Sequence, residues 1–178
     1  MWELHEKKGT KTWKELLQPA IDFAKNGFII SKEEAFNLNR YQADFKAYNK
    51  DSIPFIKKEW KAGDTLFQPV LAKTLQLIAD SGMNVFYTGT LGKKFVQDVQ
   101  ANDGIIEESD LVKYSAAFRE PVKGNFRGYE IVSMPPSSSG GIALVQLMNG
   151  ASKYPIRSWG QNSWKSIHLY TELMRRVY

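Results

Sequence analysis

The segment that decides the fold is residues 119–141, which read REPVKGNFRGYEIVSMPPSSSGG. Within it, Tyr129, Ile131 and Ser133 stand at alternate positions, and a period of two residues is typical of a β-strand. Glycine is the residue that most readily adopts the backbone angles of a tight turn. We therefore predict a β-hairpin in this segment, with its turn near Gly124.

The end of the segment, Ser137 to Gly141, lies between the predicted hairpin and a helix predicted over 142–148. Glycines here could let backbone amides approach an anion at the start of the helix. The pattern lacks the Gly-Lys-[Ser/Thr] ending of a phosphate loop, and it lacks the two glycines that flank the serine of a nucleophile elbow. We favour a tight strand-to-helix turn with serine capping. Anion or nucleotide binding stays open as the alternative.

Helical patterns occupy the rest of the chain. Thr12 to Glu15 and Ser31 to Glu34 are capping boxes that predict two helix starts, and Gly27 predicts the end of the first helical stretch. Because proline lacks a backbone donor and restricts the preceding residue, we expect a short turn and a second helix starting at Pro19. After Ser31, apolar residues at helical spacing predict one helix that continues to Tyr48.

Three further helices are predicted from apolar stripes at spacings of three and four. The stripes are Val70, Leu71, Leu75 and Ile78 in 68–79; Leu91, Phe95 and Val99 in 90–100; and Trp164, Ile167, Tyr170, Leu173, Met174 and Val177 in 162–178. We expect each stripe to face a core. A further one or two helical turns are predicted over 108–114.

Composition limits the classes of function. The chain of 178 residues has no cysteine, which excludes disulfides, cysteine metal sites and a thiol nucleophile. Its net charge of +5 is spread among acidic and apolar residues, so we expect a solvated surface and no nucleic-acid partner. No apolar run approaches the ~20 residues of a membrane span. The stretch from Met1 to Lys8 lacks the apolar core of a signal peptide.

Few side chains suggest chemistry. His168 and Glu172 have the i, i+4 spacing of two metal ligands, but a zinc site needs at least one more, so we interpret them as a polar pair on a helix surface. The acid pairs Glu33-Glu34 and Glu107-Glu108 sit at helix starts, where they complement the helix dipole. Pattern reasoning thus predicts no catalytic, cofactor or metal residue.

The chain nevertheless resembles the γ-glutamyltransferase family through a series of short motifs in the family's order. They are Met1-Trp2-Glu3 with His5 and Gly9; Leu17-Gln18-Pro19-Ala20-Ile21 with Ala24 and Gly27-Phe28; Gly63-Asp64 and Gln68-Pro69-Val70-Leu71-Ala72-Lys73-Thr74-Leu75; Phe86-Tyr87 with Gly89; Asp110-Leu111 with Tyr114; Arg119-Glu120-Pro121-Val122; Phe126-Arg127-Gly128-Tyr129; and Ser133 to Gly141. Ser137 replaces the family's third proline, which should loosen the turn without breaking it.

The resemblance implies a partial large subunit of a self-cleaving precursor. We expect an α+β chain that is predominantly helical with a small β-hairpin, as a fragment of the four-layer αββα sandwich of N-terminal-nucleophile hydrolases. It would form a single partial domain over 1–178. This domain would comprise a helical part over 1–118, the hairpin and Ser/Gly turn over 119–141, and C-terminal helices over 142–178.

In this family an N-terminal threonine of the small subunit attacks the γ-glutamyl carbonyl, with its own amine as base. Glutathione is the usual donor, and water or an amine resolves the acyl-enzyme. By the family pattern, the threonine lies after Tyr178 and the substrate-binding arginine before Met1. None of the family's catalytic residues carries over, so we expect this chain to be inactive alone and to bind no cofactor.

The expected partners are the remainder of the large subunit and the small subunit of the same precursor. A small-molecule γ-glutamyl substrate is expected only in the complete enzyme. Open sheet edges and apolar faces predict self-association of the isolated chain. The parent protein is expected in the periplasm or outside the cell, with its signal before Met1. A related acylase, a poly-γ-glutamate transpeptidase and a non-catalytic helical interaction module are the alternatives.

Overall fold

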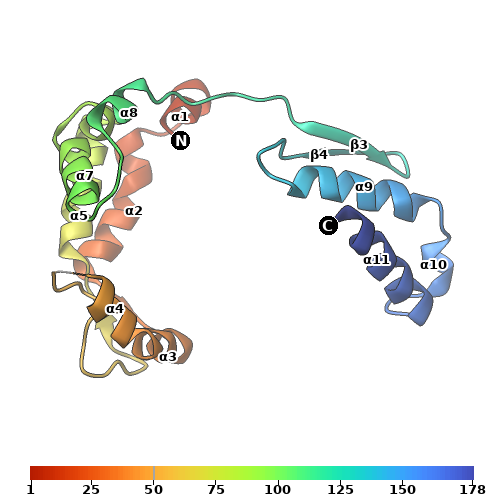
Figure 1. Cartoon of the computed structure of the whole chain (residues 1–178), viewed down its shortest axis with the longest axis horizontal. Helices are drawn as coiled ribbons and strands as arrows, with labels where there is room; N and C mark the ends of the chain where they lie inside the picture. Colours follow the sequence, from red (N-terminus) through yellow and green to blue (C-terminus); the bar gives the residue numbers. More distant parts are fainter. Residues whose placement is uncertain (50) are drawn as a thin grey trace. The chain divides into compact units, whose positions relative to one another are not determined.

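The computed structural model describes residues 1–49 and 51–178, which fold into two compact units. The first unit is Met1–Ala116, coloured red to green in Figure 1, and the second is Ala117–Tyr178, coloured green to blue. The division falls close to the boundary at residue 118 that we expected between the helical part and the hairpin. Whether both units belong to one domain stays a prediction.

The first unit is built of helices and one short pair of strands. Its elements in chain order are α1 (Trp2–Lys8), α2 (Trp13–Asn26), β1 (Phe28–Ile29), α3 (Lys32–Arg40), α4 (Gln42–Tyr48), β2 (Thr65–Leu66), α5 (Pro69–Ser81), α6 (Asn84–Tyr87), α7 (Thr90–Ala101) and α8 (Glu108–Lys113). The two strands are antiparallel, with Phe28 opposite Leu66 and Ile29 opposite Thr65.

Helix α2 runs unbroken through Pro19, so the predicted turn and second helix at that residue are wrong. The predicted capping box is confirmed, because the Thr12 hydroxyl accepts from the Glu15 amide and the Glu15 carboxylate accepts from the Thr12 amide. Proline inside a helix costs about 3 kcal/mol. Burial of Ile21 and Ala24 on the face that packs along α5 offsets this cost.

Two polar contacts fix α2 against α5, beside which it lies in Figure 1. The indole Nε1 of Trp13 donates to the Ile78 carbonyl at 3.1 Å. The ammonium of Lys14 lies 2.8 Å from the Asp80 carboxylate on the surface. The predicted stop at Gly27 is confirmed, and its φ is positive.

The segment that follows β1 contains two helices instead of the single predicted one. The capping box at Ser31 is confirmed, but α3 ends at Arg40, and Tyr41 leaves helical geometry with φ −96° and ψ 13°. The side-chain amide of Gln42 donates to the carbonyls of Leu38 and Phe55, at 3.0 and 2.7 Å. The break between α3 and α4 thus occurs where Gln42 bonds to Phe55, a residue 13 positions further along the chain. The spacing of apolar residues within the helices cannot reveal such a contact.

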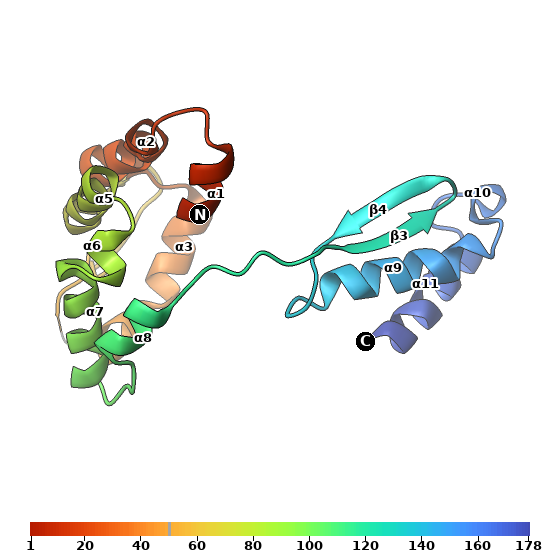
Figure 2. The same ribbon diagram turned by 90° about the horizontal axis from the view of Figure 1, so that it is seen from above.

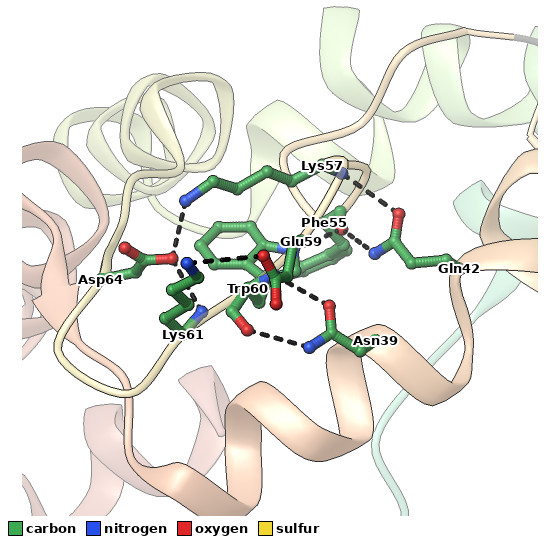
Figure 3. Close-up of polar contacts among 8 residues, drawn as sticks. All are labelled: Asn39, Gln42, Phe55, Lys57, Glu59, Trp60, Lys61 and Asp64. Carbon is green, nitrogen blue, oxygen red and sulfur yellow. Dashed lines mark hydrogen bonds and ion pairs between the residues drawn. The ribbon is translucent and has the colours of Figure 1, made fainter.

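The loop that returns from α4 to β2 is organised by Trp60, whose side chain is only 6% exposed. It belongs to the main buried cluster with Ile30, Ala35 and Leu66. The side-chain amide of Asn39 donates to the Trp60 carbonyl at 2.9 Å and accepts from the Trp60 amide at 2.8 Å (Figure 3). This two-way bond satisfies both backbone groups of a buried residue, which would otherwise cost stability.

A second set of contacts closes the same loop at Asp64 (Figure 3). The Asp64 carboxylate accepts from the Lys57 ammonium at 2.6 Å and from the Lys61 amide at 2.9 Å. These bonds, that from Lys57 foremost, hold the pKa of Asp64 below its usual range. The Lys57 ammonium also lies 4.7 Å from the centre of the Trp60 ring, a cation–π contact.

Helices α5 and α7 confirm two predicted elements, but not all of their predicted inward stripes. In α5 the buried residues are Ala72 and Ala79, whereas Val70 is 73% exposed and Leu71 42% exposed. In α7 the buried residues are Gly92 and Val96, and Phe95 is 38% exposed. Three of the four buried positions in these helices are thus alanine or glycine, and part of each predicted apolar stripe is exposed.

The second unit places a hairpin over one helix, which in turn packs on another (Figure 2). Its elements are β3 (Val122–Phe126), β4 (Tyr129–Ser133), α9 (Gly140–Ser152), α10 (Ile156–Trp159) and α11 (Trp164–Val177). Helix α9 contacts both strands of the hairpin as well as α11. No helix within the described ranges is long and apolar enough to cross a membrane.

The hairpin is confirmed, but its turn lies at Arg127 and Gly128 and not near Gly124. Both turn residues have positive φ, 51° and 88°, and the Asn125 side chain accepts from the Gly128 amide. Gly124 lies within β3 opposite Ile131. A Cβ atom at Gly124 would stand 2.9 Å from both methyl groups of Val145, so glycine there allows the close approach of α9.

Helix α11 also departs from its predicted burial. It is capped by Ser163, and Ser166 and Leu169 are its buried residues. Four members of the predicted stripe are exposed: Trp164, Ile167, Tyr170 and Met174, by 74, 55, 41 and 50%. Helix α9 contacts α11 near Leu173. The four exposed side chains form an apolar face of α11 that is uncovered in the chain described here.

The two-way bond between Asn39 and Trp60 can be tested by replacing Asn39 with alanine. The change leaves the buried backbone groups of Trp60 without partners, so we expect the free energy of unfolding to fall by about 1–3 kcal/mol. Chemical denaturation followed by tryptophan fluorescence measures it. Asn102→Ala, which removes an exposed bond to the Asp98 carbonyl, is the control and should change stability by less than about 0.5 kcal/mol. Equal losses would contradict the role of Asn39.

Candidate functional site

The Ser137 to Gly141 segment leads into α9, whose first two residues are Gly140 and Gly141, where the sequence predicted a strand-to-helix turn. Its predicted serine capping is wrong, because the N-cap residue Ser139 makes no side-chain cap bond. Instead, the Ser138 hydroxyl accepts from the Gly140 amide at 3.3 Å. The guanidinium of Arg119 donates to the Pro136 carbonyl at 2.7 Å and ties the loop to the chain before β3.

The two glycines of this turn differ in their surroundings. A Cβ atom at Gly141 would stand 2.0 Å from the Met134 carbonyl oxygen, a distance that no side chain can occupy. At Gly140 the nearest atom would be the Ser138 hydroxyl, at 3.5 Å. Gly141 therefore lets the first turn of α9 pass close to the end of β4. This geometry supports the structural interpretation of the turn over the anion-binding alternative.

The acid pairs lie at helix starts, as the sequence indicated. The Glu34 carboxylate accepts from the Ser31 amide at 2.6 Å, and this bond lowers its pKa. Glu107 is the N-cap residue of α8, and its amide donates to the Asp110 carboxylate at 2.9 Å. These contacts support a capping role for Glu34 and Glu107.

The potential metal pair His168 and Glu172 lies on α11. The Glu172 carboxylate accepts from Arg176 and Arg175, at 2.9 Å each, and these bonds lower its pKa. Among the described residues, no group of three or more His, Cys, Asp or Glu side chains is placed to hold a metal ion. Glu172 therefore lies on the helix surface, as we interpreted it, but the partners that its carboxylate bonds are these two arginines and not the predicted partner His168.

The other histidine, His5, belongs to an aromatic cluster that the sequence analysis did not assemble. Its ring centre lies 5.3 Å from that of Trp13, and Trp2 lies 5.1 Å from Trp13. The His5 Nε2 atom is 2.8 Å from the Lys11 carbonyl, which can only accept, so Nε2 carries the hydrogen. The cluster packs α1 against α2. The only signal for it in the sequence is the aromatic character of positions 2, 5 and 13.

The second unit contains a groove of about 880 Å³, hereafter the α9–α11 groove. Its lining comprises Gly150, Lys153, Tyr154, Trp159, Trp164, Lys165, His168, Leu169, Glu172, Leu173 and Arg176. Sequence reasoning missed it because these residues come from the end of α9, from α10 and its flanks, and from α11. Only the apolar spacing of α11 was visible along the chain.

Comparison with known proteins gives a consistent picture. The family model described as Gamma-glutamyltranspeptidase matches residues 1–178. The chain is 36% identical over 176 residues to a glutathione hydrolase proenzyme of Escherichia coli, covering 97% of this chain and 30% of that protein. It is 34% identical over 172 residues to the Acylase ACY 1 proenzyme of a Pseudomonas species, covering 96% of this chain and 31% of that protein.

Among solved structures, the gamma-glutamyltranspeptidase of Helicobacter pylori superposes with a TM-score of 0.93 at 37% identity. The match covers 99% of this chain and 52% of that chain. The chain spans about 30% of the length of the curated relatives named above. The predicted α+β class is confirmed, as a predominantly helical part of that fold.

The two glycines of the turn provide a matched pair of substitutions. Gly141→Ala forces the Met134 carbonyl away from α9, so we expect a loss of about 1–3 kcal/mol in the free energy of unfolding. Gly140→Ala meets only ordinary contact and gains helix propensity, so it should be neutral or slightly stabilising. Thermal unfolding followed by circular dichroism measures both. If Gly140→Ala destabilises as strongly as Gly141→Ala, the proposed close approach is not the reason for the glycine.

Proposed function

The chain belongs to the gamma-glutamyltranspeptidase family, and from this premise we propose that it is part of the large subunit of a precursor enzyme. We propose that the mature enzyme transfers or hydrolyses the γ-glutamyl group of glutathione and related amides. The observation that carries the proposal is the match to the family model over residues 1–178. The similarity to a glutathione hydrolase proenzyme supports the substrate class.

In this proposal the chain supplies scaffold and the chemistry comes from elsewhere in the precursor. Acyl transfer needs an activated nucleophile and groups that stabilise the oxyanion. His5 is occupied by the Lys11 carbonyl, and Glu34 and Glu172 are engaged in capping and ion pairs. These contacts favour structural roles for the side chains that first suggested chemistry.

The proposed reaction has two steps, both centred on the threonine at the start of the small subunit. Its hydroxyl oxygen attacks the γ-glutamyl carbonyl carbon, its own amine takes the hydroxyl proton, and the carbon–nitrogen bond of the donor breaks to release the donor amine. Water or an acceptor amine then attacks the resulting ester and restores the threonine. Helix α9 and the β3–β4 hairpin are proposed to support this centre without contacting substrate.

An acylase is the second candidate activity. Identity to the Acylase ACY 1 proenzyme is 34%, against 36% for the glutathione hydrolase, so the region in this chain does not separate the two specificities. We place the determinants of donor choice outside residues 1–178. We also propose that the complete protein acts in the periplasm or outside the cell, as the resemblance to bacterial proenzymes of this family implies.

Activity is tested with γ-glutamyl-4-nitroanilide, which releases a coloured amine when its γ-glutamyl bond breaks. We expect no release by residues 1–178 alone, because in this proposal the nucleophile is the threonine of the small subunit. The complete reading frame should cleave itself into two chains and release the amine, and alanine in place of its small-subunit threonine should abolish both. Turnover by residues 1–178 would refute the scaffold role. A complete protein that cleaves only acyl amides without a γ-glutamyl group would favour the acylase.

Self-association is proposed for the isolated chain because of the uncovered apolar face of α11. Light scattering after size exclusion should give a mass above the 20.3 kDa of one chain. The pair Ile167→Lys and Met174→Lys should restore the monomer, since it places two charges on this face. Gln146→Lys with Gln161→Lys, at exposed polar positions, is the charge-matched control. A monomeric parent chain at all concentrations would contradict the proposal.

A further inference from the structure

We propose that the α9–α11 groove is a docking site for an acidic segment of a separate polypeptide that also carries apolar side chains. The groove lies wholly within the second unit, and the proposal does not depend on the proposed enzyme activity. Its volume is about 880 Å³. Three features of its lining, taken in turn below, define the chemistry of the occupant.

The first feature is positive charge. Lys153, Lys165 and Arg176 line the groove, and Glu172 is its only acidic lining residue. Both oxygens of Glu172 already accept from arginines, one from Arg175 and one from Arg176, so this carboxylate does not cancel the lysines. Within the described ranges, the structure places no carboxylate in an ion pair with Lys153 or Lys165. The groove therefore favours carboxylates from a partner.

The second feature is a group of exposed aromatic side chains beside these cations. Trp164 is 74% exposed and Tyr154 44% exposed. Tyr154 lies against Trp159, with ring centres 6.0 Å apart and planes at 53°. Tryptophan, tyrosine and arginine are the residue types that dominate the energy of protein interfaces. Their presence together argues for an occupant that brings apolar side chains as well as charge.

The third feature is that the walls are fixed before any partner arrives. Gly150 lets α11 approach α9, because a Cβ atom there would lie 2.5 Å from a Leu173 methyl. The guanidinium of Arg127 donates to the Tyr154 carbonyl at 3.0 Å, which ties this rim to the hairpin. The Ser166 hydroxyl donates to the Gly160 carbonyl at 3.2 Å, which ties the first turn of α11 to the end of α10. A preformed groove loses little conformational entropy on binding.

A nucleic acid fits these features less well than a peptide. Single-stranded nucleic acids bind where successive bases stack on aromatic faces along a basic track. Here the rings of Tyr154 and Trp159 are tilted to each other by 53°, so they do not present parallel faces on which successive bases could stack. An acidic peptide with alternate apolar residues satisfies both the lysines and the aromatic side chains.

Fluorescence anisotropy with the full chain tests the proposal. The probe is a labelled peptide of alternating glutamate and leucine, compared with one of alternating lysine and leucine and with a labelled oligouridylate. We expect saturable binding of the glutamate peptide that weakens as salt is raised. The double variant Lys153→Glu and Lys165→Glu should weaken it by at least about tenfold, as expected for reversed charges at an interface. Trp164→Ala should weaken it without altering the salt dependence.

Lys123→Glu with Lys113→Glu is the control of equal charge change at residues that do not line the groove. It should leave binding within about twofold, as expected for charges outside an interface. The pair Ile167→Lys and Met174→Lys separates peptide binding from self-association, because these residues do not line the groove. Circular dichroism of every variant checks folding. Equal losses in control and groove variants, tighter binding of the oligouridylate, or no saturation at millimolar peptide would each overturn the proposal.

Discussion

The second unit depends on how closely α9 approaches its neighbours. A side chain at Gly124 would meet Val145, one at Gly141 would meet the Met134 carbonyl, and one at Gly150 would meet Leu173. Gly141 and Gly150 belong to α9, and Gly124 belongs to the strand β3 that faces it. At these positions the hairpin and α11 approach α9 so closely that a Cβ atom would collide with a neighbour. A two-stranded hairpin has little stability by itself in water. The hairpin, the Ser/Gly turn and the walls of the α9–α11 groove therefore all depend on contacts that α9 makes.

The features that the sequence predicted well are those set by neighbouring residues. The capping boxes at Thr12 and Ser31 need only two side chains one turn apart, and the stop at Gly27 needs only a residue that accepts positive φ. The features that it predicted wrongly are set by distant contacts. Pro19 remains helical because α2 is buried along α5, and Gly124 lies in a strand because α9 passes over it. Periodicity carries no information about either contact.

The burial of side chains also separates what neighbouring residues determine from what distant contacts determine. The pattern correctly identified apolar faces on α5, α7 and α11, but it did not say what covers them. Alanine and glycine occupy several of the tightest contacts, while Val70, Phe95 and Ile167 stay exposed. At the level of function, ordered motifs identified the family, which the match over residues 1–178 confirmed. The groove escaped prediction because α9, α10 and α11 each supply only part of its lining.

The contact between Gly124 and Val145 also constrains how this sequence can change over evolutionary time. Valine is branched at Cβ and has few alternative rotamers, so it cannot swing away from a new neighbour. A substitution at 124 is tolerable only after position 145 has become smaller, whereas a change at 145 can come first. The two positions are therefore expected to vary in a fixed order along any lineage. In such a lineage, earlier substitutions at position 145 in α9 determine which residues position 124 in β3 can accept.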